Sequence, residues 1–178
     1  MGFSQRRRVE ELLARELLLA LTLFAVALAQ TTLLPRPLDG APNLLLLLTI
    51  CQALIAGPGN ASRWAFYGGL GLDLCAASLL GTHALALLAA AISTLLLSWL
   101  SRGNWLLPLI GGVNGALAYH ATLGLITSLT VAPVEPRQYL LVAALPDILV
   151  TLVLALPTYM LMRWWAGRRR GEVPVDVY

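Results

Sequence analysis

The strongest constraint on the fold is a series of six apolar runs separated by short polar breaks. The runs cover residues 17–34, 42–56, 64–80, 84–100, 105–131 and 139–165, and a polar tail follows at 166–178. The hydrocarbon core of a bilayer is about 30 Å thick, so a helix needs about 20 apolar residues to cross it. Only 12% of the residues are charged, against about 25% in soluble domains. We therefore predict an all-α integral membrane protein with six transmembrane helices in one domain.

Two of the runs are irregular. The clearest part of the second run, Leu44–Ala56, would be only about 20 Å long as a helix, so we expect it to be tilted or packed among its neighbours. The last run contains Pro146 and Pro157, which we expect to interrupt its helix.

Arginine is distributed unevenly between the breaks. Ten of the twelve basic residues, which are all arginines, lie in segments that a six-span chain would place on one side of the membrane. They are Arg6, Arg7, Arg8, Arg15, Arg63, Arg102, Arg163, Arg168, Arg169 and Arg170, whereas Arg36 and Arg137 lie in the alternate breaks. The positive-inside rule then predicts that both termini are cytoplasmic, with the two terminal arginine triplets as the main orientation signals. The expected partner of these charges is the anionic surface of the lipid bilayer, and no nucleic-acid partner is predicted.

Asp73 is the most informative single residue, because it lies in the middle of the third run. A carboxylate there costs about 2.5–3.5 kcal/mol on insertion scales, so it needs a partner, a proton or water. Gly69, Asp73 and Ala77 share one helical face of small residues, against which another helix can pack. In a helix that fills the whole run, Asp73 would lie about 12–15 Å from the end, too far to pair with His83. Three interpretations stay open: a hydrogen bond between helices, a site for a proton, ion or small ligand, and a contact with a partner protein.

Small and polar residues in the last two runs are candidates for helix packing. Gly111 and Gly115 form a small-xxx-small face that lets another backbone approach closely. Asn114 and His120 can each hydrogen-bond to a neighbouring helix, and a lone intramembrane histidine is more often a packing residue than a metal ligand. Asp147 follows a proline and is interpreted as a helix N-terminal residue, favoured by the positive end of the helix dipole.

Motifs typical of catalysis are absent from the sequence. It has no G-x-S-x-G, no H-E-x-x-H, no phosphate-binding Gly-Lys-Ser loop, and no Ser/Lys or Asp/Asp arrangement typical of intramembrane proteases. Cys51 and Cys75 lack CxxC spacing and a neighbouring histidine, so we interpret them as small buried hydrophobic residues. We therefore predict that the protein is not an enzyme and has no catalytic, cofactor-binding or metal-binding residues.

The segment GLGLDLCAASLLGTHALALL, from residue 69 to residue 88, resembles the most recognisable segment of MreD, the rod-shape-determining integral membrane protein of bacteria. In that family a glycine-bearing helix carries an aspartate followed by leucine, then small residues, then Leu-Gly-x-His-Ala-Leu. The matching positions here are Gly69, Asp73, Leu74, Ser78, Leu80, Gly81, His83, Ala84 and Leu85. The PNLLLLL opening of the second run is similar to the Pro-Asp-Leu-Leu start of the family, with Asn43 in place of the usual acid.

This resemblance implies a non-enzymatic scaffold of the elongation (rod) complex in the bacterial cytoplasmic (inner) membrane. MreD-like proteins associate with MreC, and through it with the MreB cytoskeleton, the RodA glycosyltransferase and its class B penicillin-binding transpeptidase partner. They help to position lateral peptidoglycan synthesis and so control cell shape. The resemblance implies no cofactor, and it implies a six-helix architecture like that of the substrate-binding S-components of energy-coupling-factor transporters.

An S-component of a vitamin transporter is the alternative function. Such proteins offer an Ala-xxx-Ala face on their first helix to a transmembrane partner, and Ala25 and Ala29 have this spacing. The outer loops, however, are poor in polar and aromatic residues that could bind a ligand, and the Gly81-x-His83-Ala84 break favours MreD.

For the scaffold function, we expect the partner's membrane helix or juxtamembrane segment to dock on exposed small-residue faces. These faces are the pairs Gly111/Gly115 and Ala25/Ala29, together with the turn at Gly81. We expect Asp73 to set the packing of the third and fourth helices that shapes this surface.

Overall fold

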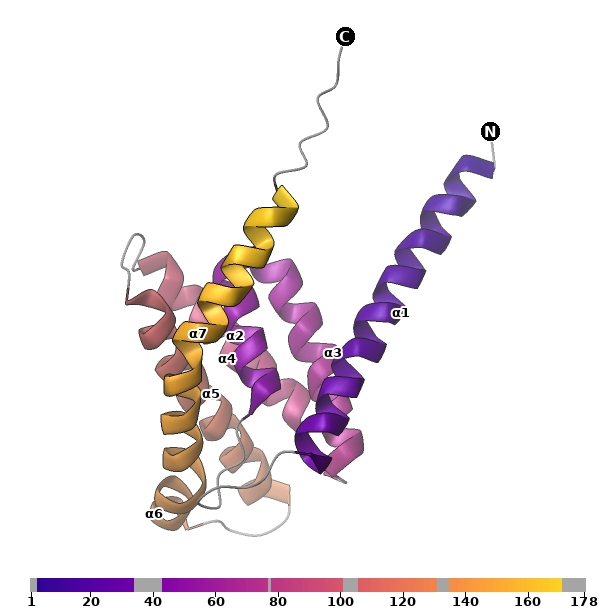
Figure 1. The fold of residues 1–178 in the computed structure, drawn as a ribbon. Helices are drawn as coiled ribbons and strands as arrows, with labels where there is room; N and C mark the ends of the chain where they lie inside the picture. The colour runs from indigo at the N-terminus through magenta and orange to yellow at the C-terminus, as the bar shows by residue number, and fades with distance from the viewer. Residues whose placement is uncertain (1–2, 34–42, 77, 101–105, 131–134, 171–178) are drawn as a thin grey trace.

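Every regular element that the computed structural model describes is a helix (Figure 1). The structure describes residues 3–33, 43–76, 78–100, 106–130 and 135–170. The elements are α1 (Phe3–Thr32), α2 (Leu44–Ala56), α3 (Pro58–Ala76), α4 (Thr82–Leu100), α5 (Leu107–Thr130), α6 (Pro136–Tyr139), the π-helical segment η2 (Leu140–Ala144) and α7 (Leu145–Arg170). The helical region thus starts at Phe3, ahead of the first apolar run, and extends into the predicted polar tail as far as Arg170.

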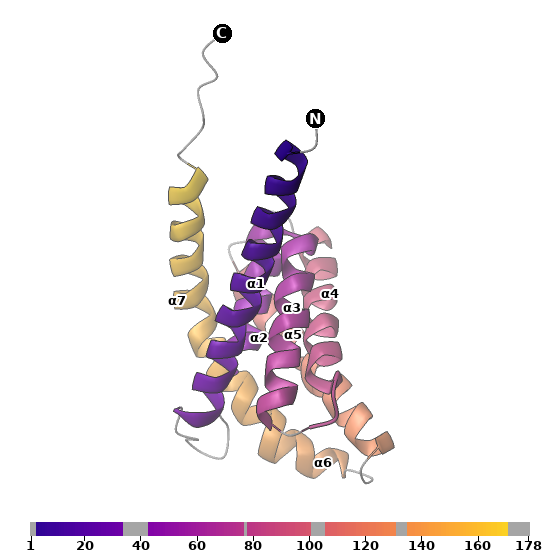
Figure 2. The same cartoon turned by 90° about the vertical axis from the view of Figure 1, so that its right-hand side faces the viewer.

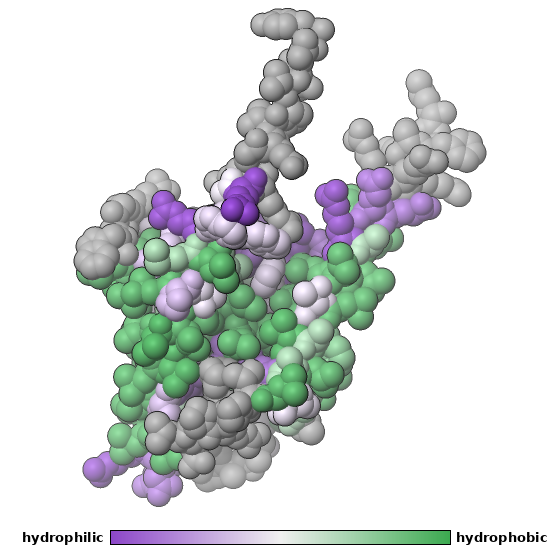
Figure 3. All heavy atoms as spheres, viewed as in Figure 1, coloured by the Kyte–Doolittle hydropathy of each residue, from purple (hydrophilic) through white to green (hydrophobic). Residues whose placement is uncertain are grey.

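Four helical stretches are long and apolar enough to cross a membrane. They are Val9–Thr32, Thr82–Leu100, Leu107–Thr130 and Pro136–Arg168. Large apolar side chains on them stay exposed, such as Leu18 on α1, Leu96 on α4 and Val153 on α7. Figure 3 shows these apolar surfaces as a broad green zone between purple polar ends. Because such a surface belongs in hydrocarbon rather than in water, the chain is an all-α, membrane-embedded protein, as the sequence predicts.

The short helix α2 forms the centre of the bundle. It has 13 residues, with the bounds that the sequence indicates for its clearest part, while the predicted start at residue 42 lies outside the described residues. α2 contacts α1, α3, α4, α5 and α7, and its Leu45, Leu46 and Ile50 are 0–1% exposed. A helix covered on all sides meets little lipid, so its length does not have to match the bilayer. The sequence left open whether this short helix is tilted or packed among its neighbours, and in the structure it is packed among them.

The helix α3 is shifted toward the N-terminus relative to the predicted run at 64–80. It begins at Pro58, directly after Gly57, whose φ of 83° and ψ of −173° are accessible chiefly to glycine. Proline is suited to the first helical position because its missing N–H would have no intrahelical acceptor there. α3 then ends at Ala76, earlier than predicted, and a turn with Gly81 at φ 96° leads into α4.

The last helical region continues through both of its prolines, contrary to the prediction that they interrupt it. It runs from Pro136 through α6, η2 and α7, and Pro157 lies inside α7. Pro146 cannot donate a backbone hydrogen bond, and the wider π turns lie directly before it. The N–H of Leu145 bonds to the carbonyl of Leu140, five residues back. The local change of helix type therefore accommodates the proline without breaking the helix.

The helices α1 and α7 diverge at the end of the bundle where α1 begins (Figures 1 and 2). The C-terminal half of α1 packs on α3, where Leu23 and Ala27 are 0–1% exposed and Ala27 lies against Gly71. In its N-terminal half, side chains from Val9 to Leu18 are exposed, apart from the half-buried Glu16. One end of the bundle is therefore closed and the other is splayed.

Candidate functional site

Asp73 is buried and connects α3 to the start of α4. Its side chain is 1% exposed and accepts three hydrogen bonds. The Oδ1 atom accepts from the Ser78 hydroxyl and from the backbone N–H of His83, both at 2.9 Å, and Oδ2 accepts from the N–H of Gly81 at 2.8 Å. Amides at a helix start lack intrahelical acceptors and form the positive end of the helix dipole. Asp73 therefore caps α4 from the preceding helix.

This position of Asp73 differs from the sequence expectation. A full-length third helix would have put the carboxylate about 12–15 Å from the turn, but α3 ends at Ala76 and leaves Asp73 in its last turn. The partner of Asp73 is the backbone of His83, not its ring. The ring Nδ1 lies 2.7 Å from the Tyr119 hydroxyl on α5. Of the three interpretations of Asp73, the geometry favours a hydrogen bond between helices.

Gly69 brings the backbones of α3 and α4 into direct contact. A Cβ atom at Gly69 would lie 2.2 Å from the Cα and 2.5 Å from the backbone nitrogen of Ala84. No such side chain fits without moving a helix, so only glycine is compatible with this approach. The face predicted from Gly69 and Asp73 is thus a packing face against α4, and its third member, Ala77, lies outside the described residues.

A second buried polar cluster surrounds His120 and Asp147. The His120 Nε2 atom lies 2.7 Å from Asp147 Oδ2, and their side chains are 10% and 8% exposed. His120 Nδ1 lies 3.3 Å from the Tyr139 hydroxyl, and Asp147 Oδ1 accepts from the backbone N–H of Asn43 at 3.3 Å. The cluster thus joins α5, α6 and α7 to the start of α2. Because the helical region already begins at Pro136, Asp147 is not a free helix N-terminus, and its interpretation as one is corrected.

Asn43 occupies the centre of the polar contacts. Its Oδ1 caps α2 by accepting from the Leu46 N–H at 3.0 Å and also accepts from Gln30 Nε2 at 3.3 Å. Gln30 Oε1 accepts in turn from the Leu45 N–H at 3.2 Å. An amide can accept and donate at once, whereas an ionised acid at this position could only accept.

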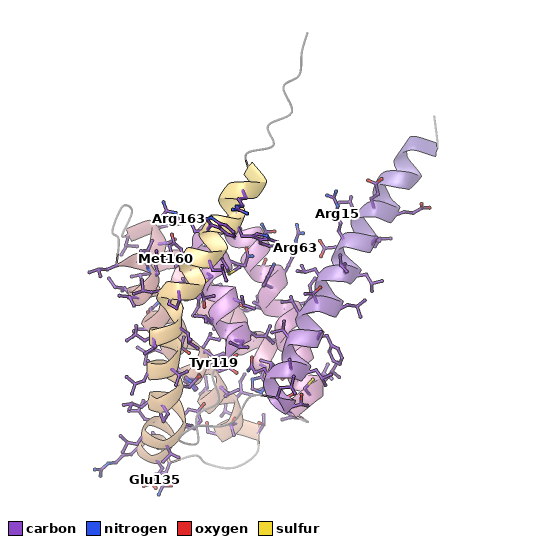
Figure 4. All side chains as sticks on the ribbon, in the orientation of Figure 1. Arg15, Arg63, Tyr119, Glu135, Met160 and Arg163 are labelled. Carbon is purple, nitrogen blue, oxygen red and sulfur yellow. The ribbon has the colours of Figure 1, made fainter. Side chains whose placement is uncertain are left out.

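The two clusters meet where the Tyr119 and His120 rings lie edge to face, with their centroids 5.3 Å apart, and we call the two together the polar network. Its members are Gln30, Asn43, Asp73, Ser78, His83, Tyr119, His120, Tyr139 and Asp147. Together they link α1, α2, α3, α4, α5, α6 and α7. Figure 4 places Tyr119 away from the end that carries Arg15, Arg63 and Arg163. The network therefore lies toward the closed end of the bundle.

A pocket of about 380 Å³ lies beside His120, between α5 and the last helical region. Its lining is mostly apolar and comprises Leu117, His120, Ala121, Gly124, Leu125, Ser128, Pro136, Tyr139, Leu140 and Ala144. Leu125 and Leu140 are about half exposed or more, so the pocket opens on the apolar outer surface. Its polar groups are already engaged: His120 with Tyr139, and the Ser128 hydroxyl with the Leu125 carbonyl at 2.8 Å.

Gly111 and Gly115 pack inside the bundle, so they do not form the exposed docking face that we expected. A Cβ at Gly115 would lie 2.8 Å from both Ile50 Cδ1 on α2 and Thr94 Oγ1 on α4. One at Gly111 would lie 3.4 Å from Thr94 Cγ2. The pair does allow close approach, but of helices within this chain. On the first helix, Ala25 is exposed and Ala29 is half-buried.

The arginines gather at the splayed end. Arg15, Arg63 and Arg163 lie at the same end of the bundle in Figure 4, and Glu135 marks the opposite end. The Arg168 guanidinium lies 3.7 Å from the centre of the Trp164 ring, a cation–π contact at the end of α7. For the other orientation residues, Arg6, Arg7, Arg8, Arg169 and Arg170, the structure describes the helical backbone but not the side chains.

The histidines engage groups that hold helices together. His83 and His120 bond to tyrosine hydroxyls, and His120 also bonds to the Asp147 carboxylate. The same ranges contain no group of three histidine, cysteine or acidic residues able to hold a metal ion. The arrangement is therefore suited to bridging helices.

Four members of the network were not predicted as such from the sequence: Gln30, Asn43, Tyr119 and Tyr139. Gln30 is a polar residue within an apolar run, and Asn43 directly precedes one, which is the usual position of a helix cap. These signals identify buried polar residues but not their partners, because Asn43 and Asp147 are 104 positions apart in the chain.

No protein-family model, curated protein or solved structure matches this chain. In the structure, the segment from residue 69 to residue 88 contains the Asp73-capped turn and the Gly69–Ala84 contact.

Proposed function

We propose that this protein is a non-enzymatic membrane scaffold of the MreD type that docks an MreC-like protein in the bacterial cytoplasmic (inner) membrane. Through that partner it helps to position the RodA glycosyltransferase, its class B penicillin-binding transpeptidase and the MreB cytoskeleton. The result is lateral peptidoglycan synthesis at defined places and control of cell shape.

The observation that carries this proposal is the arrangement of the residues in the resembling segment. Asp73, Gly81 and His83 meet in one capped turn, and Gly69 meets Ala84 across the two helices. Motif residues that lie far apart in a structure would suggest a chance similarity. Here they form a single compact unit, which supports an inherited structural motif.

In the proposed topology all six apolar segments cross the membrane and both termini are cytoplasmic. The four long helices are joined by α2, which is covered by its neighbours and needs little contact with lipid, and by α3, which is buried on one face. The position of Arg15, Arg63 and Arg163 at one end supports this orientation.

The S-component alternative receives less support. A vitamin-binding site needs polar groups that are free to meet the ligand. The pocket beside His120 is mostly apolar and opens sideways, and its His120 and Tyr139 already contact each other.

Affinity purification from native membranes in mild detergent tests the proposal. We expect to recover an MreC-like protein together with RodA and its transpeptidase. Asp73→Leu should lower this recovery by disrupting the α3–α4 turn, whereas the control Glu135→Gln changes an exposed carboxylate and should not. Recovery of a transmembrane coupling subunit with paired ATPases would overturn the scaffold and establish the transporter alternative.

A further inference from the structure

The last turns of α7 form an open surface hollow of about 610 Å³ at the splayed end. Figure 4 shows two of the lining residues, Met160 and Arg163, on α7 at this end. Residues four apart in a helix lie above one another, so the lining forms two neighbouring rows on one face of α7. The rows are Tyr159, Arg163 and Gly167, and beside them Met160, Trp164 and Arg168. One helix face therefore carries two guanidinium groups, two aromatic rings and a glycine around a single hollow.

Gly167 leaves open space beside both arginines. Nothing lies within 4 Å of the position that a Cβ atom would occupy at this glycine. The Arg168 guanidinium lies 3.7 Å from the centre of the Trp164 ring, which restrains its charge next to this space. The hollow can thus take a group of another molecule without any movement of the helix.

The hollow is positively charged, and the described part of the chain does not compensate this charge. Neither Arg163 nor Arg168 forms an ion pair with a described residue. The one acidic residue of α7, Asp147, lies several turns earlier and bonds to His120. Guanidinium groups beside an open space attract an anion, and their planar sets of N–H donors match the oxygens of a phosphate.

The position of the hollow along α7 indicates where this phosphate comes from. The apolar stretch that is able to cross a membrane ends at Arg168, so the hollow lies at the level of the lipid headgroups. Trp164 is exposed there, and tryptophan is typical of this level. Met160 is 68% exposed and extends the hollow toward the hydrocarbon. A molecule in the hollow meets phosphate-binding groups on one side and apolar groups on the other, which matches a phospholipid.

We propose that this hollow binds one anionic phospholipid, with its phosphate between Arg163 and Arg168 at Gly167 and the start of an acyl chain against Met160. An anionic headgroup is favoured because a zwitterionic one brings its own cation toward the two arginines. A second copy of the chain that docked through the same face would bring arginine against arginine, which is unfavourable. The inference requires that α7 spans the membrane and does not depend on the scaffold function.

Native mass spectrometry of the full chain in mild detergent tests the site. The probes are phosphatidylglycerol and phosphatidylcholine with identical acyl chains, each added at increasing concentration. We expect one phosphatidylglycerol to bind at least about tenfold more tightly than phosphatidylcholine, because each arginine near an anionic headgroup contributes about fivefold. Inorganic phosphate at the same concentration should not displace the lipid, since it lacks the apolar part. Equal binding of the two lipids, or displacement by inorganic phosphate, would overturn the proposal.

Gly167→Leu separates a shaped site from a diffuse attraction between charges. The substitution fills the hollow and leaves every charge in place, and it should not disturb the fold because no atom lies near the new Cβ. We expect the affinity for phosphatidylglycerol to fall about fivefold or more, as the phosphate loses its place beside the arginines. Gly59→Leu is the matched control, because the space around that glycine is equally open. Unchanged affinity in Gly167→Leu would overturn the proposal.

Two arginine variants separate the site from the net charge. Arg163→Gln and Arg137→Gln remove the same charge, but Arg137 lies on α6 at the other end of the bundle (Figure 1). We expect the affinity for phosphatidylglycerol to fall about fivefold in Arg163→Gln and less than about twofold in Arg137→Gln. Equal losses would mean that the lipid responds only to net charge, which contradicts a site at α7. A protein dimer that Gly167→Leu abolishes and lipid does not displace would identify a second copy as the occupant, and this too would overturn the proposal.

Discussion

The two ends of this bundle are held together in different ways. At the closed end, the polar network bonds every helix to at least one other, mostly through groups that are less than a tenth exposed. At the splayed end, the described hydrogen bonds between side chains of different helices reduce to Glu16–Arg63, whose side chains are 34% and 53% exposed. Buried, fully bonded polar groups fix one arrangement, whereas exposed pairs contribute little. The closed end of the bundle is therefore held more firmly by the described bonds than the splayed end is.

This separation suits a scaffold. Helix association in a membrane depends on close packing and on hydrogen bonds rather than on the hydrophobic effect. A protein that must keep its own fold while it offers a helix face to a partner benefits from locking one end. The closed end has the required bonds, and the first half of α1 has the free face. Substitutions at the two ends should therefore differ in what they disturb.

The largest loss of stability should come from Asp73→Leu. The change leaves the N–H groups of Gly81 and His83 and the Ser78 hydroxyl without their acceptor. We expect the free energy of unfolding in detergent to fall by about 4 kcal/mol, since each buried unsatisfied group costs about 1–3 kcal/mol. Asp73→Asn should lose less, because one amide oxygen can still serve His83 and Ser78. Equal stability of the leucine variant and the wild-type protein would contradict the capping role.

Gly69→Ala should have the next largest effect. The added Cβ would meet the Ala84 backbone at 2.2 Å, so α3 and α4 have to separate. We expect a loss of about 3 kcal/mol, at the upper end of ordinary overpacking. Gly59→Ala is the matched control on the same helix, because nothing lies within 4 Å of its Cβ position. Thermal unfolding of both variants measures the difference, and similar melting temperatures would show that the helices do not approach closely at Gly69.

Much of the fold could be predicted because hydropathy and helix breakers act locally. The 13 residues of α2 follow directly from a leucine-rich run that ends at a glycine. The end of α3 was predicted too late in the chain, for a physical reason. The apolar run continues to Leu80, and nothing in its hydropathy indicates that the helix ends at Ala76. The capping bonds of Asp73 compete with continued helix there, and only three-dimensional contact reveals them.

The candidate site was only partly predictable for a related reason. Gly69, Asp73, Gly81 and His83 lie close in sequence, so a local pattern could identify them together. The His120–Asp147 pair joins residues from two helical regions, and no spacing rule connects them. The packing partner of Gly115 could not be predicted either. A small-xxx-small face has the same sequence pattern whether it packs against a helix of its own chain or against a partner.

Asp147→Asn tests the other part of the polar network, with a smaller expected effect. The amide can still accept one hydrogen bond, but the charged acceptor shared by His120 and Asn43 is lost. We expect a loss of about 2 kcal/mol, typical of a weakened hydrogen bond to a charged group. Glu135→Gln makes the same chemical change at an exposed residue without a side-chain cap bond and should be neutral. If both variants unfold like the wild-type protein, the closed end is not held by this cluster.

The smallest change in stability is expected for Arg63→Gln at the splayed end. Because its ion pair with Glu16 is partly exposed, the free energy of unfolding should change by less than about 1 kcal/mol. Chemical unfolding of the variant beside Gly69→Ala gives the comparison within one helix. A loss as large as that from Asp73→Leu would mean that the splayed end also holds the fold together. A small loss means that α1 is anchored by its second half, so its first half can bind a partner without a cost to the bundle.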